Sequence, residues 1–263
     1  MIKQSVHWVI QTNIFAEEGF EALINAIKTF GLPCTLVKVV PFIGDLEPVE
    51  GTLPPDGAKA IVMGSYTLAK VAKQRGWVPG AFVENLDFEI QREHWGDRML
   101  NYDAVVTAFD QVSFQRMPFF LRPVHDTKAF TGFVCDWPYY EEWRDSVRLV
   151  PETTTLTADT PVMICSKKEI YSETRFWIVA GRVVTQSGYK LGTIKRYTRP
   201  EEVDPLLCDF AIETVSVWTP NEAFVLDLAM TAEGPKIVEV NNLNSAGWYK
   251  GDLQKLVNAL ENI

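Results

Sequence analysis

The chain has 263 residues and a formal net charge of -9, with 47% hydrophobic and 22% charged residues. This composition supports a packed core and excludes a globally disordered chain. The acidic balance argues against broad binding to a nucleic-acid backbone, which needs clustered Lys and Arg. It does not argue against a small phosphorylated ligand that arrives with a divalent cation.

The four cysteines are far apart and form no C-x-x-C pair; they are Cys34, Cys135, Cys165 and Cys208. We therefore expect buried, reduced thiols rather than a zinc site or a disulfide framework. The N-terminus lacks the long apolar run of a secretory signal, and no stretch approaches the roughly 20 apolar residues that a membrane helix needs. These features predict a cytoplasmic protein with no membrane partner.

The first part of the chain alternates short apolar runs with amphipathic segments. The expected strands are residues 6–10, 34–40 and 59–65, and the expected helices are residues 16–31 and 66–76. Apolar residues at helical spacing mark the first helix, and Gly31 follows it as a stop signal. The β-α-β-α order predicts a small open sheet with crossover helices, in an α/β domain over residues 1–115.

From about residue 116 the pattern changes to longer strands joined by hairpins, which predicts a second domain over residues 116–263. The expected strands are residues 119–124, 130–137, 160–166, 173–179, 182–190 and 224–242, the last interrupted by a turn. Gly181 occupies a hairpin position between two apolar strands. Helices are expected within residues 201–214 and over the amphipathic C-terminal segment 252–263.

Three oxygen-bearing side chains share one side of the last predicted hairpin. A three-residue loop over residues 232–234 places Asp227 opposite Glu239, with Asn241 two residues further along the same face. Two carboxylates this close repel each other unless a cation or a proton lies between them. Oxygen ligands suit Mg²⁺ or Mn²⁺, and Mg²⁺ usually takes further ligands from substrate phosphates. The hairpin therefore predicts a metal–nucleotide site, against the alternative of ordinary polar residues facing solvent.

Cations for the phosphates occur in an upstream stretch, FFLRPVHDTKAFTG. Arg122 ends an apolar strand, and Lys128 follows in a loop before Gly132. A guanidinium at a strand end and an ammonium on a loop can clamp polyphosphate oxygens. The alternative is that both are solvated surface residues. His125 in the same loop is a weaker candidate for a substrate contact.

The strand that ends near residue 166 is a candidate for adenine recognition through its backbone groups. The predicted nucleotide contacts there are Met163, Ile164, Cys165 and Ser166. Glu169, or the Ser166 hydroxyl, is placed to accept a hydrogen bond from a ribose.

Glu173 and Arg175 alternate on one face of the next strand, beside the bulky Phe176 and Trp177 that indicate an interior sheet. In that position Arg175 can reach a phosphoryl group that is being transferred. The alternative is a surface ion pair worth under about 1 kcal/mol.

Taken in order, these residues resemble the ATP-grasp superfamily, and more narrowly its R-two-K clade from phages and bacteria. The matching motifs are Arg122-Pro123, Lys128 to Gly132, Glu173-Thr-Arg175-Phe176, Asp227 and Glu239-Val-Asn241. The resemblance covers about residues 116–263 and implies an α+β fold whose two subdomains clasp ATP. The first 115 residues correspond to the α/β domain that often precedes this fold.

The resemblance also implies roles for individual residues. Asp227, Glu239 and Asn241 hold two Mg²⁺ ions, with Glu239 bridging them. Arg175 steadies the transferred phosphoryl group, and Arg122 stands where many members have a lysine. The residues expected near the second substrate are Asn244, Ser245 and Gly247, which replace a Pro-Gly turn, and Tyr249, which either lines an acceptor pocket or fills the core.

The predicted reaction is an ATP- and Mg²⁺-dependent ligation of a carboxylate to an amine or a thiol, through an acyl phosphate. No side-chain nucleophile is needed, which agrees with the lack of a G-x-S-x-G motif, and ATP-grasp sites bind phosphate without a P-loop. Small metabolites, peptides and protein side chains all remain open as acceptors. The alternatives are a kinase with the same ATP site and a nucleotide-binding regulator without turnover.

Overall fold

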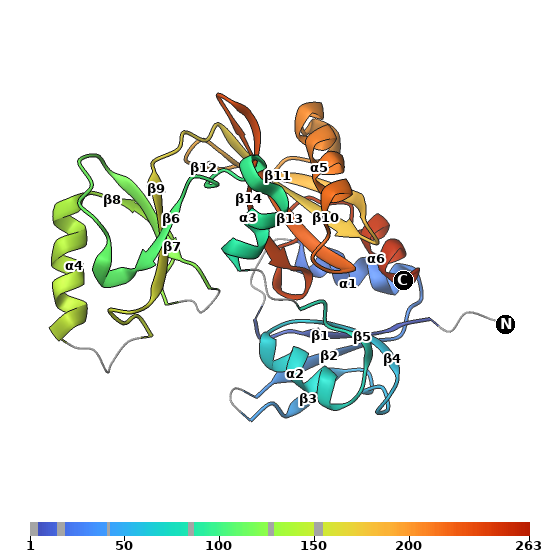
Figure 1. Cartoon of the computed structure of the whole chain (residues 1–263). Helices are drawn as coiled ribbons and strands as arrows, with labels where there is room; N and C mark the ends of the chain where they lie inside the picture. The colour runs from blue at the N-terminus through green and yellow to red at the C-terminus, as the bar shows by residue number, and fades with distance from the viewer. Residues whose placement is uncertain (1–4, 15–18, 41–42, 84–86, 126–128, 150–154) are drawn as a thin grey trace.

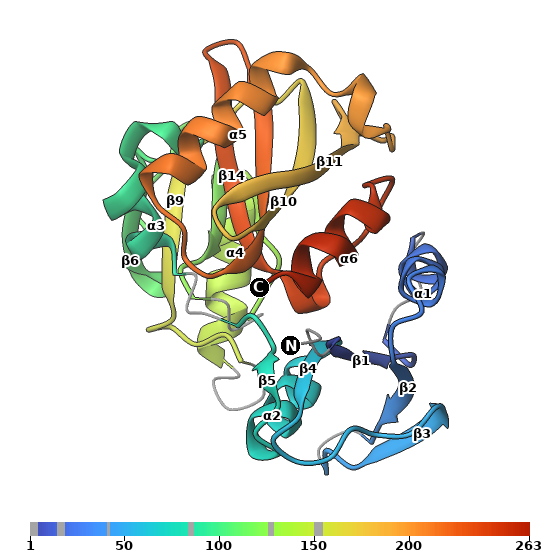
Figure 2. The same ribbon diagram turned by 90° about the vertical axis from the view of Figure 1, so that its right-hand side faces the viewer.

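The computed structural model describes residues 5–14, 19–40, 43–83, 87–125, 129–149 and 155–263. They fold into three sheets with flanking helices, which stand apart in Figure 1; in the turned view of Figure 2 the small sheet overlaps with the large one. Within these residues no helix is both long enough and apolar enough to cross a bilayer.

The N-terminal sheet has the strand order β3-β2-β1-β4-β5. Its elements are β1 (His7–Gln11), α1 (Phe20–Thr29), β2 (Cys34–Val39), β3 (Leu46–Glu50), β4 (Lys59–Met63), α2 (Tyr66–Gln74) and β5 (Val78–Gly80). Strands β2, β1, β4 and β5 pair in parallel, so the expected crossover helices are confirmed. Sequence periodicity did not indicate β3, a short edge strand whose Pro48 and two glutamates limit further pairing.

The small sheet has the order β6-β9-β7-β8. Its elements are β6 (Val105–Ala108), β7 (Phe119–Pro123), β8 (Phe133–Cys135), α4 (Trp137–Leu149) and β9 (Pro161–Ser166). Helix α4 covers one face, where Tyr140 donates a hydrogen bond to the Phe109 carbonyl within an aromatic core. Strand β6 precedes residue 116 yet pairs with β9, so this sheet draws on both sides of the expected domain boundary, which stays a prediction.

The large sheet has the order β12-β11-β10-β13-β14. Its elements are β10 (Ser172–Val179), β11 (Arg182–Leu191), β12 (Ile194–Lys195), α5 (Pro205–Val217), β13 (Ala223–Thr231), β14 (Gly234–Asn242) and α6 (Leu253–Glu261). Short 3-10 helices lie at Gly96–Arg98 (η1), Phe109–Gln111 (η2), Pro200–Glu202 (η3) and Leu243–Ser245 (η4). The predicted helices near residues 201–214 and 252–263 correspond to α5 and α6.

Opposite faces of the large sheet are buried by different helices. Phe176, Leu226 and Leu228 pack against α5 and α3 (Phe88–Trp95), whereas Trp177 and Val225 face α6, which also packs on α1. This alternation follows from the period of two along a strand. Arg175 and Asp227 are also at odd positions of β10 and β13, so they lie on the same face of the sheet as Trp177 and Val225.

The β13–β14 hairpin reaches the expected alignment by a different route. Its loop has two residues, because Thr231 pairs with Gly234, so the expected three-residue loop is wrong. A bulge at Val238 then inserts one extra residue into β14, and Asp227 still faces Glu239. The shorter loop and the bulge shift the register by one residue each in opposite senses, so the two deviations cancel.

The four cysteines are free, as expected, but only Cys135 and Cys165 are buried, whereas Cys34 and Cys208 are half-buried. Burial raises the pKa of Cys34, Cys135 and Cys165 to about 11, which keeps these thiols protonated at neutral pH.

Candidate active site

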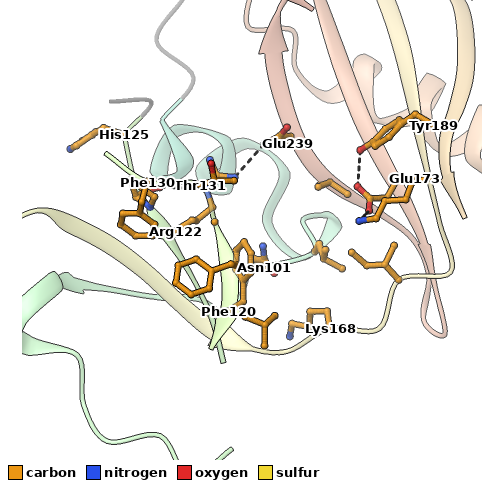
Figure 3. Close-up of a pocket in the computed structure, with 18 residues that line it drawn as sticks. Asn101, Phe120, Arg122, His125, Phe130, Thr131, Lys168, Glu173, Tyr189 and Glu239 are labelled. Atoms are coloured by element: carbon orange, nitrogen blue, oxygen red, sulfur yellow. Dashed lines mark hydrogen bonds and ion pairs between the residues drawn. The ribbon is translucent and has the colours of Figure 1, made fainter. Parts of the chain in front are cut away.

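A cavity of about 690 Å³ lies between the small sheet and the large sheet. Figure 3 shows side chains from β7 and from the loop before β8 on one side, and side chains from β10, β11 and β14 on the other. Arg122, His125, Lys168 and Lys190 supply basic groups to its walls, and Glu173 and Glu239 supply carboxylates. The space and its charge suit a polyphosphate ligand that is partly neutralised by protein cations.

One ion pair crosses this cavity. Arg122 Nη1 lies 3.6 Å from Glu239 Oε2, which joins the end of β7 to β14. Both side chains are partly exposed to the cavity, so each remains accessible to a ligand. The sequence assigned Arg122 to phosphate and Glu239 to metal, and the structure brings the two predicted groups to one place.

Asp227, Glu239 and Asn241 form a contiguous acidic group, as their expected alignment requires. The amide Nδ2 of Asn241 donates to Glu239 Oε1 at 2.9 Å and lies 3.4 Å from Asp227 Oδ2. Burial and the charge of Asp227 raise the pKa of Glu239, and the hydrogen bond from Asn241 opposes them. The hydrogen bonds within the group of Asp227, Glu239 and Asn241 therefore do not fully stabilise the negative charge of its two carboxylates.

Arg175 is part of the same cluster but not of the cavity wall. Its guanidinium binds both oxygens of Asp227, and its Nη1 lies 3.4 Å from the Gly247 carbonyl. Burial alone would lower the pKa of Arg175, but the charge of Asp227 and the hydrogen bonds to it, together with Tyr249 and Tyr189, raise the pKa above its ordinary value. Arg175 is therefore a permanent cation close to the predicted metal ligands.

Glu173 lies in the cavity wall at the start of β10 and is 7% exposed. It accepts hydrogen bonds from Tyr189 Oη at 2.7 Å and from Lys190 Nζ at 2.5 Å. Burial, together with the charges of Asp227 and Glu173, raises the pKa of Tyr189 and keeps its hydroxyl protonated. Glu173 is thus held in place by two neighbours on β11, of which Lys190 has a side chain that is 40% exposed.

The donor set fits magnesium by its chemistry. Two carboxylates and an amide oxygen are hard ligands of the kind that Mg²⁺ prefers. A carboxylate has about four lone-pair sites, so Asp227 retains acceptor capacity beside the two bonds from Arg175. In the part of the chain that the structure describes, no cluster of three or more His, Cys, Asp or Glu side chains forms a metal site. Any metal at this place therefore depends on Asn241 and on ligand oxygens.

The four predicted adenine contacts on β9 differ in their surroundings. Strand β9 has partner strands on both sides, so the backbone groups of Met163 and Ile164 pair within the sheet and do not form a free edge. Cys165 donates from its thiol to Asn101 Oδ1 at 3.3 Å, and Asn101 itself lines the cavity. Ser166 is exposed at the strand end.

Glu169 is exposed and lines a second, smaller hollow of about 260 Å³ beside the β13–β14 hairpin loop, not the large cavity. Lys128 lies outside the described residues. His125 lines the large cavity, and its Nδ1 lies 3.0 Å from Asp87 Oδ2.

The predicted substrate residues separate into two groups. Asn244 is 2% exposed; its side chain donates to the Val62 carbonyl and accepts from the Phe82 backbone N–H at 2.7 Å. It therefore joins η4 to the N-terminal sheet, and both the nitrogen and the oxygen of its side-chain amide are hydrogen-bonded there. Tyr249 and the Gly247 carbonyl contact Arg175, and Ser245 is exposed next to them.

Several cavity residues were missing from the sequence prediction. They are Asn101, Phe120, Thr131, Lys168, Tyr189 and Lys190. Lys190 faces Glu173 only because β11 contains two register shifts. An undistorted hairpin with its turn at residues 180–181 would place Gly188 there, so no local signal indicated Lys190.

A family model described as an ATP-grasp domain of the R-two-K clade, family 3, matches residues 48–260. The chain belongs to this family. No curated protein matches the sequence. The ATP-grasp assignment confirms the resemblance seen in the motifs, and it extends further toward the N-terminus than residue 116.

Solved structures share the ATP-grasp fold at low sequence identity. The D-cycloserine synthetase DcsG has a TM-score of 0.59 at 13% identity, covering 98% of this chain and 99% of that one. A RimK domain ATP-grasp protein from Sphaerobacter thermophilus DSM 20745 has a TM-score of 0.58 at 14% identity, covering 91% and 92%. The ATP-grasp ligase PsnB, complexed with a minimal precursor, has a TM-score of 0.56 at 10% identity, covering 98% and 99%.

Proposed function

We propose that this ATP-grasp protein is an ATP- and Mg²⁺-dependent ligase that joins a carboxylate to an amine or a thiol through an acyl phosphate. One observation carries the proposal: Glu239 belongs both to the wall of the cationic cavity and to the acidic group with Asp227 and Asn241. A ligand that fills the cavity with phosphates would therefore reach Glu239, the member of the acidic group that lines the cavity. Structural relatives include a D-cycloserine synthetase and an ATP-grasp ligase complexed with a precursor.

In the proposed reaction, a carboxylate oxygen of the acid attacks the γ-phosphorus of ATP. The bond from that phosphorus to the β,γ-bridging oxygen breaks, and ADP leaves. The amine or thiol then attacks the acyl carbon, the bond to the phosphate oxygen breaks, and inorganic phosphate leaves while the nucleophile's proton passes to solvent. Each bond that forms is balanced by one that breaks, so no redox partner is required.

The protein's own groups contribute positioning and charge. Arg122 and Lys190, which line opposite walls of the cavity, would bind phosphate oxygens. Arg175, a permanent cation behind Asp227, would stabilise negative charge on the transferred group. Asp227, Glu239 and Asn241 would hold Mg²⁺, which when bound neutralises charge on the phosphoryl oxygens.

A product assay separates this proposal from its alternatives. The protein is incubated with Mg-ATP, a panel of carboxylic acids, and amines or thiols, and ADP and phosphate are measured. A ligase releases phosphate only when an acid and an acceptor are both present, and hydroxylamine traps its acyl phosphate as a hydroxamate. A kinase instead gives a phosphorylated product without free phosphate, and a regulator binds ATP without turnover.

The matched variants are Glu239→Gln and Glu233→Gln. Glu233 lies in the loop of the same hairpin, with its side chain 79% exposed, and serves as the control. We expect phosphate release to fall at least about a hundredfold in Glu239→Gln and to stay unchanged in the control. Full activity of Glu239→Gln would remove the metal assignment.

A further inference from the structure

The segment from residue 174 to residue 200 has an unusual charge. It contains six basic residues and no Asp or Glu, although the whole chain has 34 acidic and 25 basic residues. The segment includes β11 and β12, and β12 is the edge strand of the large sheet (Figure 1). Three of the six basic residues, Lys195, Arg196 and Arg199, lie in β12 or directly after it, at this edge of the sheet.

The cations at this edge surround an aromatic stack. Tyr197 and Tyr249 have ring centroids 5.1 Å apart at an interplanar angle of 18°, and Tyr189 stacks on Tyr249 at 5.3 Å. Arg196 and Lys250 are the chain neighbours of two of these tyrosines. The segment is fixed on β11 by hydrogen bonds between Gly188 and Thr198.

We define the cationic edge as Lys195, Arg196, Arg199 and Lys250, all of which are exposed. Within the described residues, Lys195, Arg196 and Lys250 have no carboxylate within 4.0 Å, and Arg199 has only a 4.0 Å contact with Glu201. In addition, Lys195 pairs directly across the strand with Lys190, whose ammonium is bound to Glu173.

The cationic edge leads to the candidate active site through the aromatic stack. The guanidinium carbon of Arg175 lies 5.0 Å from the centroid of the Tyr249 ring, and Arg175 binds Asp227. A chain that lies along the edge would therefore have one of its groups beside the place where phosphoryl transfer is proposed. A surface with several separate cations suits a ligand with several separate anionic groups better than it suits a small molecule with one anionic group.

We propose that the cationic edge binds an acidic peptide, which supplies the carboxylate that is activated with ATP. That the peptide supplies the activated carboxylate rests on the proposed ligase function. That the cationic edge binds an acidic peptide rests on the charges alone. A peptide is favoured over a polynucleotide because the reaction consumes a carboxylate and because the acidic remainder of the protein opposes a long phosphate backbone.

Binding is tested by fluorescence anisotropy with labelled decaglutamate, decalysine and a ten-nucleotide oligothymidylate, without ATP. The triple variant Lys195→Glu, Arg196→Glu and Arg199→Glu is compared with a control triple variant at exposed positions of the N-terminal domain, Lys38→Glu, Lys70→Glu and Lys73→Glu. Both triple variants change the net charge by the same amount.

We expect saturable binding of decaglutamate to the unmodified protein, weakened at least about tenfold in the edge variant and less than about twofold in the control. No binding of decaglutamate, equal losses in both variants, or tighter binding of oligothymidylate would each overturn the assignment. Failure of the proposed function is a separate outcome. If decaglutamate binds, but neither decaglutamate nor any other acid in the panel leads to phosphate release, the ligase proposal is wrong and the peptide-binding surface is retained. Mg-ATP binding, measured in the same variants, should not change.

Discussion

The guanidinium of Arg175 binds both carboxylate oxygens of Asp227, from Nε at 2.8 Å and from Nη2 at 2.7 Å. The two residues are direct partners across β10 and β13, and they are 8% and 1% exposed. A bidentate pair in the interior is a strong interaction, but its formation requires that two charges leave water. Removal of one partner should therefore change the unfolding free energy very differently from removal of both.

Loss of one member of this pair should be much worse than loss of both. Arg175→Met leaves the Asp227 carboxylate buried without its cation, which costs about 3–5 kcal/mol of unfolding free energy. The double variant Arg175→Met/Asp227→Leu should recover most of that loss. Urea unfolding in magnesium-free buffer measures both, with the exposed pair of Lys28 and Glu50 as the reference for a surface interaction. The interpretation would be contradicted if the loss of unfolding free energy in the double variant equalled the sum of the losses in the two single variants.

Glu239 should make the metal-free protein less stable as the pH rises. Its pKa is raised in the folded state by burial and by Asp227, so between pH 4.5, the ordinary value, and the folded-state pKa the folded protein binds more protons than the unfolded chain. Stability from this group is present below pH 4.5 and is lost as the pH increases through the folded-state pKa. Glu239→Gln should lack that loss in urea unfolding across the same range.

Magnesium should reverse the effect of pH on the unmodified protein. A bound cation favours the ionised form of Glu239, so Mg²⁺ should increase stability at neutral pH for the unmodified protein and much less for Glu239→Gln. Calcium-free and magnesium-free samples treated with a chelator provide the baseline. Parallel stability curves for the two proteins, with and without Mg²⁺, would show that Glu239 does not bind the ion.

Asn244 should be needed for the attachment of the N-terminal domain. Asn244→Ala leaves the Phe82 N–H and the Val62 carbonyl without partners in a buried place, at a cost of about 2–5 kcal/mol in total. Hydrogen exchange at the Phe82 amide should become faster, and the unfolding free energy should fall. Ser245→Ala, at the exposed neighbour, is the control and should change neither. Unchanged exchange at Phe82 would refute the role.

Gly132 should be required for the shape of the cavity. A Cβ atom at this position would lie 2.8 Å from Arg122 Cβ and 2.9 Å from Phe120 Cζ, so Gly132→Ala has to shift the backbone at residue 132 or displace both of these cavity residues. We expect the Kd for Mg-ATP, measured by calorimetry, to rise about tenfold, equivalent to about 1.4 kcal/mol. Gly181→Asn, in a hairpin turn with open space around it, should bind as the unmodified protein does.

The sequence by itself determined the order of the elements and the family. Apolar runs of period two and helical segments with stop signals located most strands and helices, because those patterns depend only on local backbone geometry. The spacing of Asp227, Glu239 and Asn241 along one hairpin was sufficient to predict an oxygen-rich group. Helices α3 and α4 and strand β3 lacked a comparable pattern.

Only the tertiary structure decided which of these residues share a site. Lys190 faces Glu173 because of two register shifts in β11, and Glu239 faces Asp227 because a bulge offsets a shorter loop. Asn244, expected beside a substrate, is instead hydrogen-bonded to the backbone of Val62 and Phe82. Bulges and contacts between distant segments arise from packing across the whole fold, and a local sequence pattern does not encode that packing.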